Sequence, residues 1–207
     1  MASLLSNSKM ADKVSNPILP SLAKINCMKL FLICSILVIS LTGFANRIDP
    51  QGQVDSIPAD PKDVGSMEGL IAAVYDVISG PAGQVRNWDR MRTLFVPDAR
   101  MIATGKRQDG TMGRRVMSVE DYISLSGPNL EKNGFFETEI SRKVDQYGAV
   151  VHIFSTYAAK RTTTDEKPFM RGINSFQLWN DGKRWWVVTI FWQAESADNP
   201  IPEKYLG

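Results

Sequence analysis

Residues 169–194 read FMRGINSFQLWNDGKRWWVVTIFWQA, two largely apolar segments on either side of the tripeptide NDG at 180–182. This tripeptide favours a tight hairpin, because type I′ turns require positive φ angles. The stretch therefore predicts two antiparallel strands, at 169–179 and 183–194. Both faces of the second strand carry large apolar side chains, whereas an antiparallel sheet normally leaves one face in water. We expect helices to cover one face. A second copy of the chain, or the chain's own C-terminal tail, covers the other.

The period of two continues upstream of this hairpin. Strands are predicted at 136–144 and 150–160, joined by a turn at Tyr147-Gly148. A shorter strand is expected at 100–104, with a candidate partner at 114–117. Antiparallel neighbours joined by short turns form a meander, so the C-terminal half of the chain is expected to be one sheet.

Before this sheet, apolar residues recur with the helical period of 3.6. The first helix is expected to begin at the N-cap Ser66 and to end at Gly80-Pro81. A second runs from about Asn87 to just before Pro97, and a third begins with a capping box at 118–121 and ends near Gly127-Pro128. Helices first and an antiparallel meander second is the α+β pattern.

The N-terminal segment has the form of a signal peptide. Lys29 precedes twelve apolar residues at 30–41, and small residues lead to a cleavage site after Ala45. The apolar run is shorter than the roughly 20 residues that a membrane-spanning helix needs. Export to the periplasm or the medium is therefore predicted, with an uncleaved leader as the alternative and the only expected membrane contact. Met28 offers an alternative start.

These features divide the chain into four parts. They are a leader at 1–45, a proline-containing flexible tether at 46–64, a folded domain at 65–197 and a tail at 198–207. Beyond residue 45 the net charge is −1, which argues against nucleic-acid binding because that needs a basic face. Both cysteines lie in the leader, so the mature part has neither a disulfide nor a thiolate metal site. No metal and no cofactor is predicted.

Three features together resemble the nuclear transport factor 2-like superfamily, which includes SnoaL-like cyclases, ketosteroid isomerases and scytalone dehydratases. They are the segment FVPDAR at 95–100, the capping-box helix and the segment DGKRWWVV at 181–188. The resemblance covers about residues 66–195. It implies a cone, in which a strongly curved, mainly antiparallel sheet wraps three N-terminal helices and leaves an internal pocket. It also implies a homodimer through the outer sheet face. The fold hosts both enzymes and binders, so it does not settle function.

Two residues are candidates for catalysis. His152 is the only histidine and has an ordinary pKa suited to a general base near neutral pH. Tyr75 occupies the place on the first helix where isomerase-like members carry a tyrosine that stabilises an oxyanion. Asp98 is expected at the mouth of the cone, as a ligand contact or a turn residue. Ala103 stands where the isomerases carry their base, which argues against isomerase-type enolisation.

Polar side chains within apolar strands indicate a ligand pocket, because buried polar groups need partners. Strict alternation puts Thr189 and Gln193 on the same face as Trp185 and Phe191. The predicted ligand-binding residues are Trp88, Asp98, Tyr122, Asn174, Thr189 and Gln193.

The leading hypothesis is an exported domain that binds a small apolar or amphipathic molecule. The alternatives are a lyase or isomerase with His152 as base, and a protein-interaction module that uses the outer sheet face. The sequence does not decide between binding and catalysis.

Overall fold

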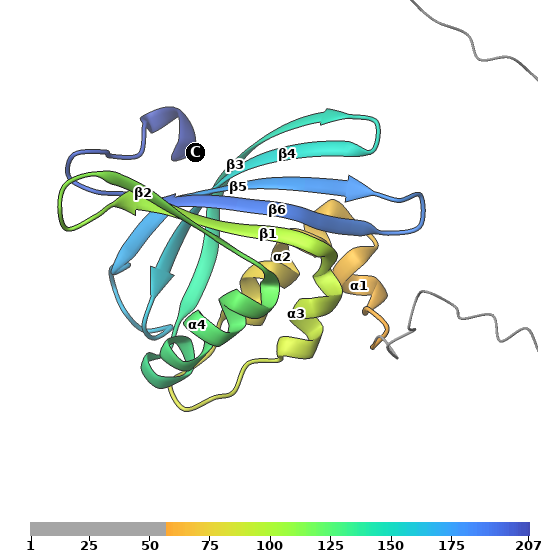
Figure 1. The fold of residues 1–207 in the computed structure, drawn as a ribbon, viewed down its shortest axis with the longest axis horizontal. Coiled ribbons are helices and arrows are strands. Elements are labelled where there is room, and N and C mark those ends of the chain that lie inside the picture. The colour runs from red at the N-terminus through yellow and green to blue at the C-terminus, as the bar shows by residue number, and fades with distance from the viewer. Residues whose placement is uncertain (1–56) are drawn as a thin grey trace, which may run out of the picture. The chain divides into compact units, whose positions relative to one another are not determined.

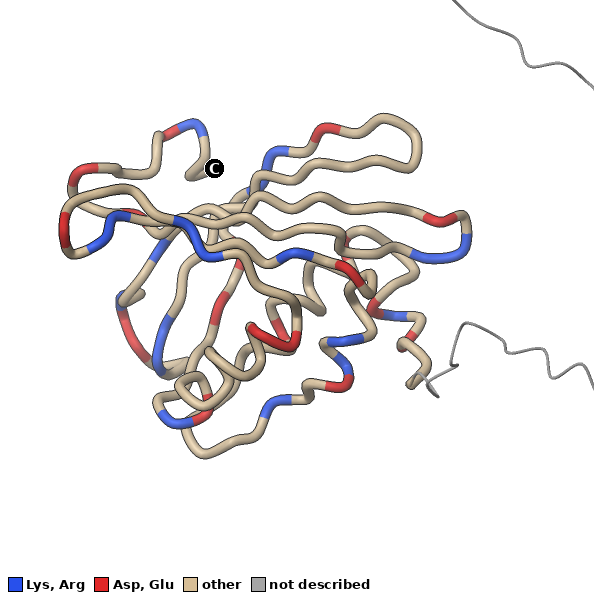
Figure 2. Tube along the Cα trace, in the orientation of Figure 1, with Lys and Arg blue, Asp and Glu red and all other residues tan. Residues whose placement is uncertain are grey.

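The computed structural model describes residues 57–207 (Figure 1). The predicted leader, its cleavage after Ala45 and the tether up to residue 56 lie outside the described residues. Within residues 57–207, no helix combines the length and the apolar character needed to cross a membrane. Cationic and anionic residues alternate over this part of the chain without forming a face of one sign (Figure 2).

Six strands form one curved sheet in the order β2-β1-β6-β5-β4-β3. All neighbours are antiparallel except β1 and β6, which are parallel. The helices pack within the curve of the sheet (Figure 1), which confirms the α+β fold with a curved, mainly antiparallel sheet. The strands are β1 Phe95–Lys106, β2 Met112–Met117, β3 Phe136–Tyr147, β4 Val150–Lys160, β5 Met170–Asn180 and β6 Trp185–Ala194. The helices are α1 Pro61–Val64, α2 Met67–Ile78, α3 Trp88–Leu94 and α4 Val119–Asn133, followed after the sheet by a 3-10 turn, η1 Glu203–Tyr205.

The local signals for helix starts agree with the structure. Ser66 caps α2, Asn87 caps α3, and Ser118 with Asp121 forms the complete capping box of α4. The end of α4 differs from the prediction, because the helix continues through Pro128 to Asn133. Leu130 is buried in the core on this last part, and its burial outweighs the N–H that proline cannot donate.

The folded domain also begins earlier than predicted. The short helix α1 lies in the segment assigned to the tether, with Asp60 as its N-cap. Asp63 is buried and accepts two hydrogen bonds from Arg90, at 2.7 and 2.9 Å. This ion pair joins α1 to α3, so residues 57–64 belong to the domain rather than to a flexible tether.

A buried arginine ties together the ends of α2 and α4. The guanidinium of Arg86 donates to the carbonyl oxygens of Ile78 at 3.0 Å, Gly80 at 2.6 Å and Leu130 at 3.1 Å. Its remaining nitrogen donates to the carbonyl of Gln84 at 2.5 Å. These carbonyls lie at helix ends and in a connecting loop, where no helical N–H is available to them. Arg86 therefore does the work of several caps.

A bulge in β6 changes which side chains face the helices. Gln177 pairs with Thr189 but Leu178 pairs with Val187, so one residue of β6 has no partner. Val187 and Ile190 are consequently both buried, and the residues between and after them turn outward. The prediction that Thr189 and Gln193 face the interior is therefore wrong, because strict alternation does not survive an inserted residue.

The outer face of the sheet is partly covered by the chain's own tail. Thr156 donates to the carbonyl of Tyr205 at 2.6 Å, and the ring of Tyr205 lies 5.0 Å from that of Phe154. Ile201 is buried as well. The tail at 198–207 thus covers this face at β4, which was the alternative to cover by a second copy. Phe191 of β6 is still 43% exposed on the same face.

Candidate functional site

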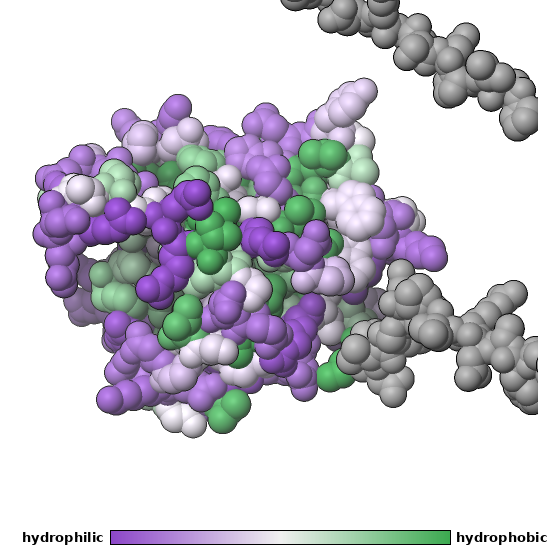
Figure 3. Space-filling model, in the orientation of Figure 1, coloured by the Kyte–Doolittle hydropathy of each residue, from purple (hydrophilic) through white to green (hydrophobic). Residues whose placement is uncertain are grey.

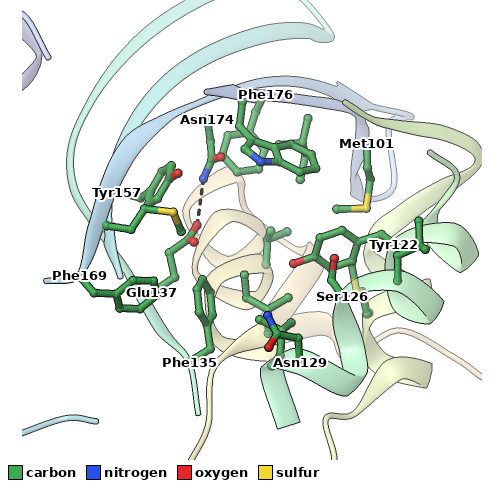
Figure 4. Close-up of a pocket in the computed structure, with 18 of the residues that line it drawn as sticks. Met101, Tyr122, Ser126, Asn129, Phe135, Glu137, Tyr157, Phe169, Asn174 and Phe176 are labelled. Carbon is green, nitrogen blue, oxygen red and sulfur yellow. Dashed lines mark hydrogen bonds between the residues drawn. The ribbon is translucent and has the colours of Figure 1, made fainter. Parts of the chain in front are cut away.

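A cavity of about 410 Å³ lies between the inner face of the sheet and the helices. In the space-filling view, apolar residues are recessed beneath the β1–β2 hairpin (Figure 3). Aromatic rings and methionines from α4 and four strands form most of its wall (Figure 4). Its polar wall residues are Tyr122, Ser126, Asn129, Glu137, Tyr157, Arg161 and Asn174.

The carboxyl group of Glu137, at the start of β3, is the distinctive polar feature of this cavity. Asn174 of β5 donates from Nδ2 to Glu137 Oε1 at 3.1 Å (Figure 4). Burial raises the pKa of Glu137 to about 7, and the bond from Asn174 offsets only part of that rise. A carboxyl with such a pKa changes charge near neutral pH, so it can hold, release or take up a proton there.

Sequence reasoning did not find Glu137. In the strand pattern it belongs to the polar set that alternates with Phe136, and such a residue normally faces water. In the structure it pairs with Ala159, and Glu139 pairs with Tyr157, both on the inner face of β4. The available sign was the pair of glutamates at equal parity, but register between strands was needed to read it.

A chain of hydrogen bonds holds Asn174 from behind. Its Nδ2 also donates to Tyr75 Oη at 3.2 Å, and that phenol oxygen lies 2.7 Å from Ser155 Oγ. Ser155 donates in turn to Glu139 at 2.5 Å. Burial, with the nearby charge of Glu137 as a smaller cause, raises the pKa of Tyr75, so its phenol stays protonated. Tyr75 is a buried positioning residue that does not line the cavity.

Two other phenols do reach the cavity. Tyr122 of α4 and Tyr157 of β4 lie in its wall, and neither hydroxyl bonds to another residue within the described chain. Burial is the main cause that raises the pKa of both phenols. Both are therefore neutral hydroxyls that can bond to a ligand.

The structure places His152 on the opposite side of the sheet. Its Nε2 lies 3.0 Å from Ser175 Oγ, and its ring contacts Phe154 on the outer face. The neighbours Val151 and Ile153 are the ones that point inward and are fully buried. His152 and Tyr75 therefore share no cavity, and the prediction of His152 as base for a substrate bound beside Tyr75 is wrong.

The remaining predicted residues divide in the same way. Tyr122 and Asn174 lie in the cavity wall. Asp98 is exposed on β1, and Trp88 packs beside Gly127 and donates to Glu131 at 3.3 Å, so both lie outside the cavity. Thr189 and Gln193 lie outside it too, because the bulge turns them to the outer face.

A second hollow of about 660 Å³ lies between α3, the start of α4 and β1. Its most prominent charges, Arg92 and Glu120, already pair with each other at 2.6 Å. It thus offers no unpaired charge of the kind Glu137 provides. Within residues 57–207, no group of three or more histidine, cysteine or acidic side chains is arranged to hold a metal ion.

No protein-family model matches the chain, and no curated protein matches it significantly. Similar solved structures include a protein of unknown function with a cystatin-like fold from Nostoc punctiforme, at 9% identity and a TM-score of 0.47, over 63% of this chain and 90% of that one. Another is an NTF2-like protein of unknown function from Silicibacter pomeroyi, at 11% and 0.44, over 63% and 94%. A third is an NTF2-like protein of unknown function from Methylobacillus flagellatus, at 16% and 0.41, over 63% and 95%. These matches agree with the resemblance at the level of fold and assign the chain no activity.

Proposed function

We propose that this domain binds a small, mostly apolar molecule in the cavity, with a polar group of the ligand against Glu137. The observation that carries the proposal is a carboxyl at the wall of an apolar cavity, held by Asn174 at 3.1 Å. Small-molecule sites combine largely apolar walls with a few convergent polar groups. Glu137, Asn174 and the two free phenols supply those groups.

The cavity can be tested by filling it. Ser126 lies in its wall on α4, so Ser126→Phe would place a ring in the space that a ligand needs. Ligand-observed NMR with 3-phenylpropanol as the probe is expected to show binding to the wild type and at least about tenfold weaker binding to this variant. His152→Ala, on the outer face, serves as the control and should bind the probe like the wild type. Equal binding by all three proteins would contradict the proposal.

The leader supports a further proposal, that the domain acts after export. Expression of the full chain in a bacterial host is expected to yield a periplasmic or secreted protein whose first residue is Asn46. Intact-mass measurement would show this cleavage. A product that keeps residues 1–45 would indicate an uncleaved anchor instead.

An acid–base enzyme is the second candidate function, with Glu137 in the role expected of His152. The observation that favours it is the pKa of about 7, since a general base works best when its pKa is near the working pH. Deuterium exchange into enolisable ketones, present in the wild type and lost in Glu137→Gln, would support it. No exchange above the solvent rate across such a series would count against it.

For the outer face, we propose a homodimer. Phe191, with Ile102 and Val116 beside it on the paired strands, forms the part of this face that lies away from the tail. Sedimentation of the mature domain at micromolar concentration is expected to give twice the monomer mass, and Phe191→Asp is expected to give the monomer. A wild-type monomer in the same experiment would leave this face to a different protein partner.

A further inference from the structure

Glu137 differs from the other shielded carboxylates of the domain in having no cation beside it. Asp63 pairs with Arg90, and Glu139 pairs with Arg142. Within residues 57–207, Glu137 forms no salt bridge, and its printed hydrogen bond is the single one from Asn174. An ionised carboxylate away from water is costly unless a positive charge accompanies it. A glutamine would accept the same bond without that cost.

The walls around Glu137 are unusually rich in aromatic rings. The cavity-lining aromatic residues are Tyr122, Phe135, Tyr157, Phe169, Phe176 and Trp192. The faces of such rings attract cations, which is how quaternary ammonium groups are bound in aromatic cages. One ring already does so, because the guanidinium of Arg161 lies 3.9 Å above the centre of Phe169.

We propose that the cavity takes a small organic cation, a protonated amine or a quaternary ammonium, whose charge lies against Glu137 and the surrounding rings. The inference rests on the proposed function and names the class of its ligand. The cation would supply the missing partner of the carboxylate, and the apolar part of the ligand would fill the remaining volume of about 410 Å³.

The other groups around Glu137 are compatible with this ligand. Tyr75 from α2, Tyr122 from α4 and Tyr157 from β4 are neutral phenols, whose oxygens can accept from an ammonium. The charge of Glu139 is matched by Arg142. Arg161 is a permanent cation in the cavity wall, held by the ring of Phe169 and by the carbonyl of Gly134 at 3.3 Å.

A matched series of probes tests the charge separately from the shape. We would measure the affinity of 3-phenylpropylamine, 3-phenylpropanol and 3-phenylpropanoate for the mature domain by titration calorimetry at pH 8. The amine is expected to bind at least about tenfold more tightly than the alcohol, and the carboxylate most weakly. Between pH 5.5 and 8 the amine affinity should rise at least about fivefold, because Glu137 ionises over this range while the amine stays protonated.

The variant Glu137→Gln keeps the shape of the site and removes the charge. It is expected to lose at least about tenfold in amine affinity and its pH dependence, while alcohol affinity changes by less than about threefold. Glu166→Gln, on an exposed loop, is the control and should match the wild type. Equal affinity for amine and alcohol, or a preference that survives in Glu137→Gln, would overturn the cation inference and leave the binding function standing. Failure of all three probes to bind the wild type at millimolar concentration would overturn both.

Discussion

Glu137→Gln is expected to make the folded protein more stable at pH 8, by about 2–3 kcal/mol, and to change its stability little at pH 4. The folded protein holds the Glu137 proton up to a pKa of about 7, whereas the unfolded chain releases it near 4.5. The unfolded state therefore binds fewer protons between these values, and the stability of the wild type falls as the pH rises through this window. Above it, the full cost of the buried carboxylate is present. Glutamine carries no such cost at any pH.

Urea unfolding of the wild type and the variant at pH 4 and pH 8 would measure this effect. The two denaturation curves should nearly coincide at pH 4 and separate at pH 8, with similar slopes. Glu166→Gln should follow the wild type at both pH values, because its side chain is exposed. If Glu137→Gln is no more stable than the wild type at pH 8, then the carboxyl is not destabilised by its surroundings. A residue that costs stability and is nevertheless present is a reasonable candidate for function.

Arg86→Met is expected to destabilise the domain by about 3–5 kcal/mol. Methionine fills a similar volume but donates no hydrogen bonds. The carbonyls of Ile78, Gly80 and Leu130 would then lose their guanidinium partner in a place that water does not reach. Each buried acceptor left without a donor costs about 1–3 kcal/mol, which is why the expected loss is large.

Chemical denaturation at pH 7 would measure this loss, and Arg92→Met is the matched control. Arg92 also forms ion pairs, with Asp89 and Glu120, but its side chain is 42% exposed. Exposed pairs contribute little, so its replacement should cost less than about 1 kcal/mol. Similar losses for the two variants would show that Arg86 acts only through its charge and not through the carbonyls that it joins.

Features that depend on neighbouring residues could be predicted from the sequence. Ser66 and Ser118 cap helices because their side chains reach backbone N–H groups three residues away. Gly182 makes the turn between the last two strands because its φ of 88° suits glycine. Each of these depends on a few consecutive residues, so no tertiary information was needed.

The candidate site could be predicted only in part. Tyr122 and Asn174 stood out as polar groups in apolar surroundings, and both lie in the cavity wall. Thr189 and Gln193 stood out for the same reason and lie on the other face. The difference is a single inserted residue in β6, which exchanges inward for outward positions over the rest of the strand.

The sequence by itself determined the order of helices and strands, the turns that join them and the α+β class, because periodicity and capping act over a few residues. The tertiary structure decided which face each strand presents, and with it the exclusion of His152 and the selection of Glu137. It also decided the buried role of Arg86 and the cover of the outer face by the tail. These depend on strand register and on contacts between segments up to about a hundred residues apart, such as the bond from Asn174 to Tyr75. The charge of a carboxyl near pH 7 is set by that surrounding, because burial rather than residue type raises its pKa.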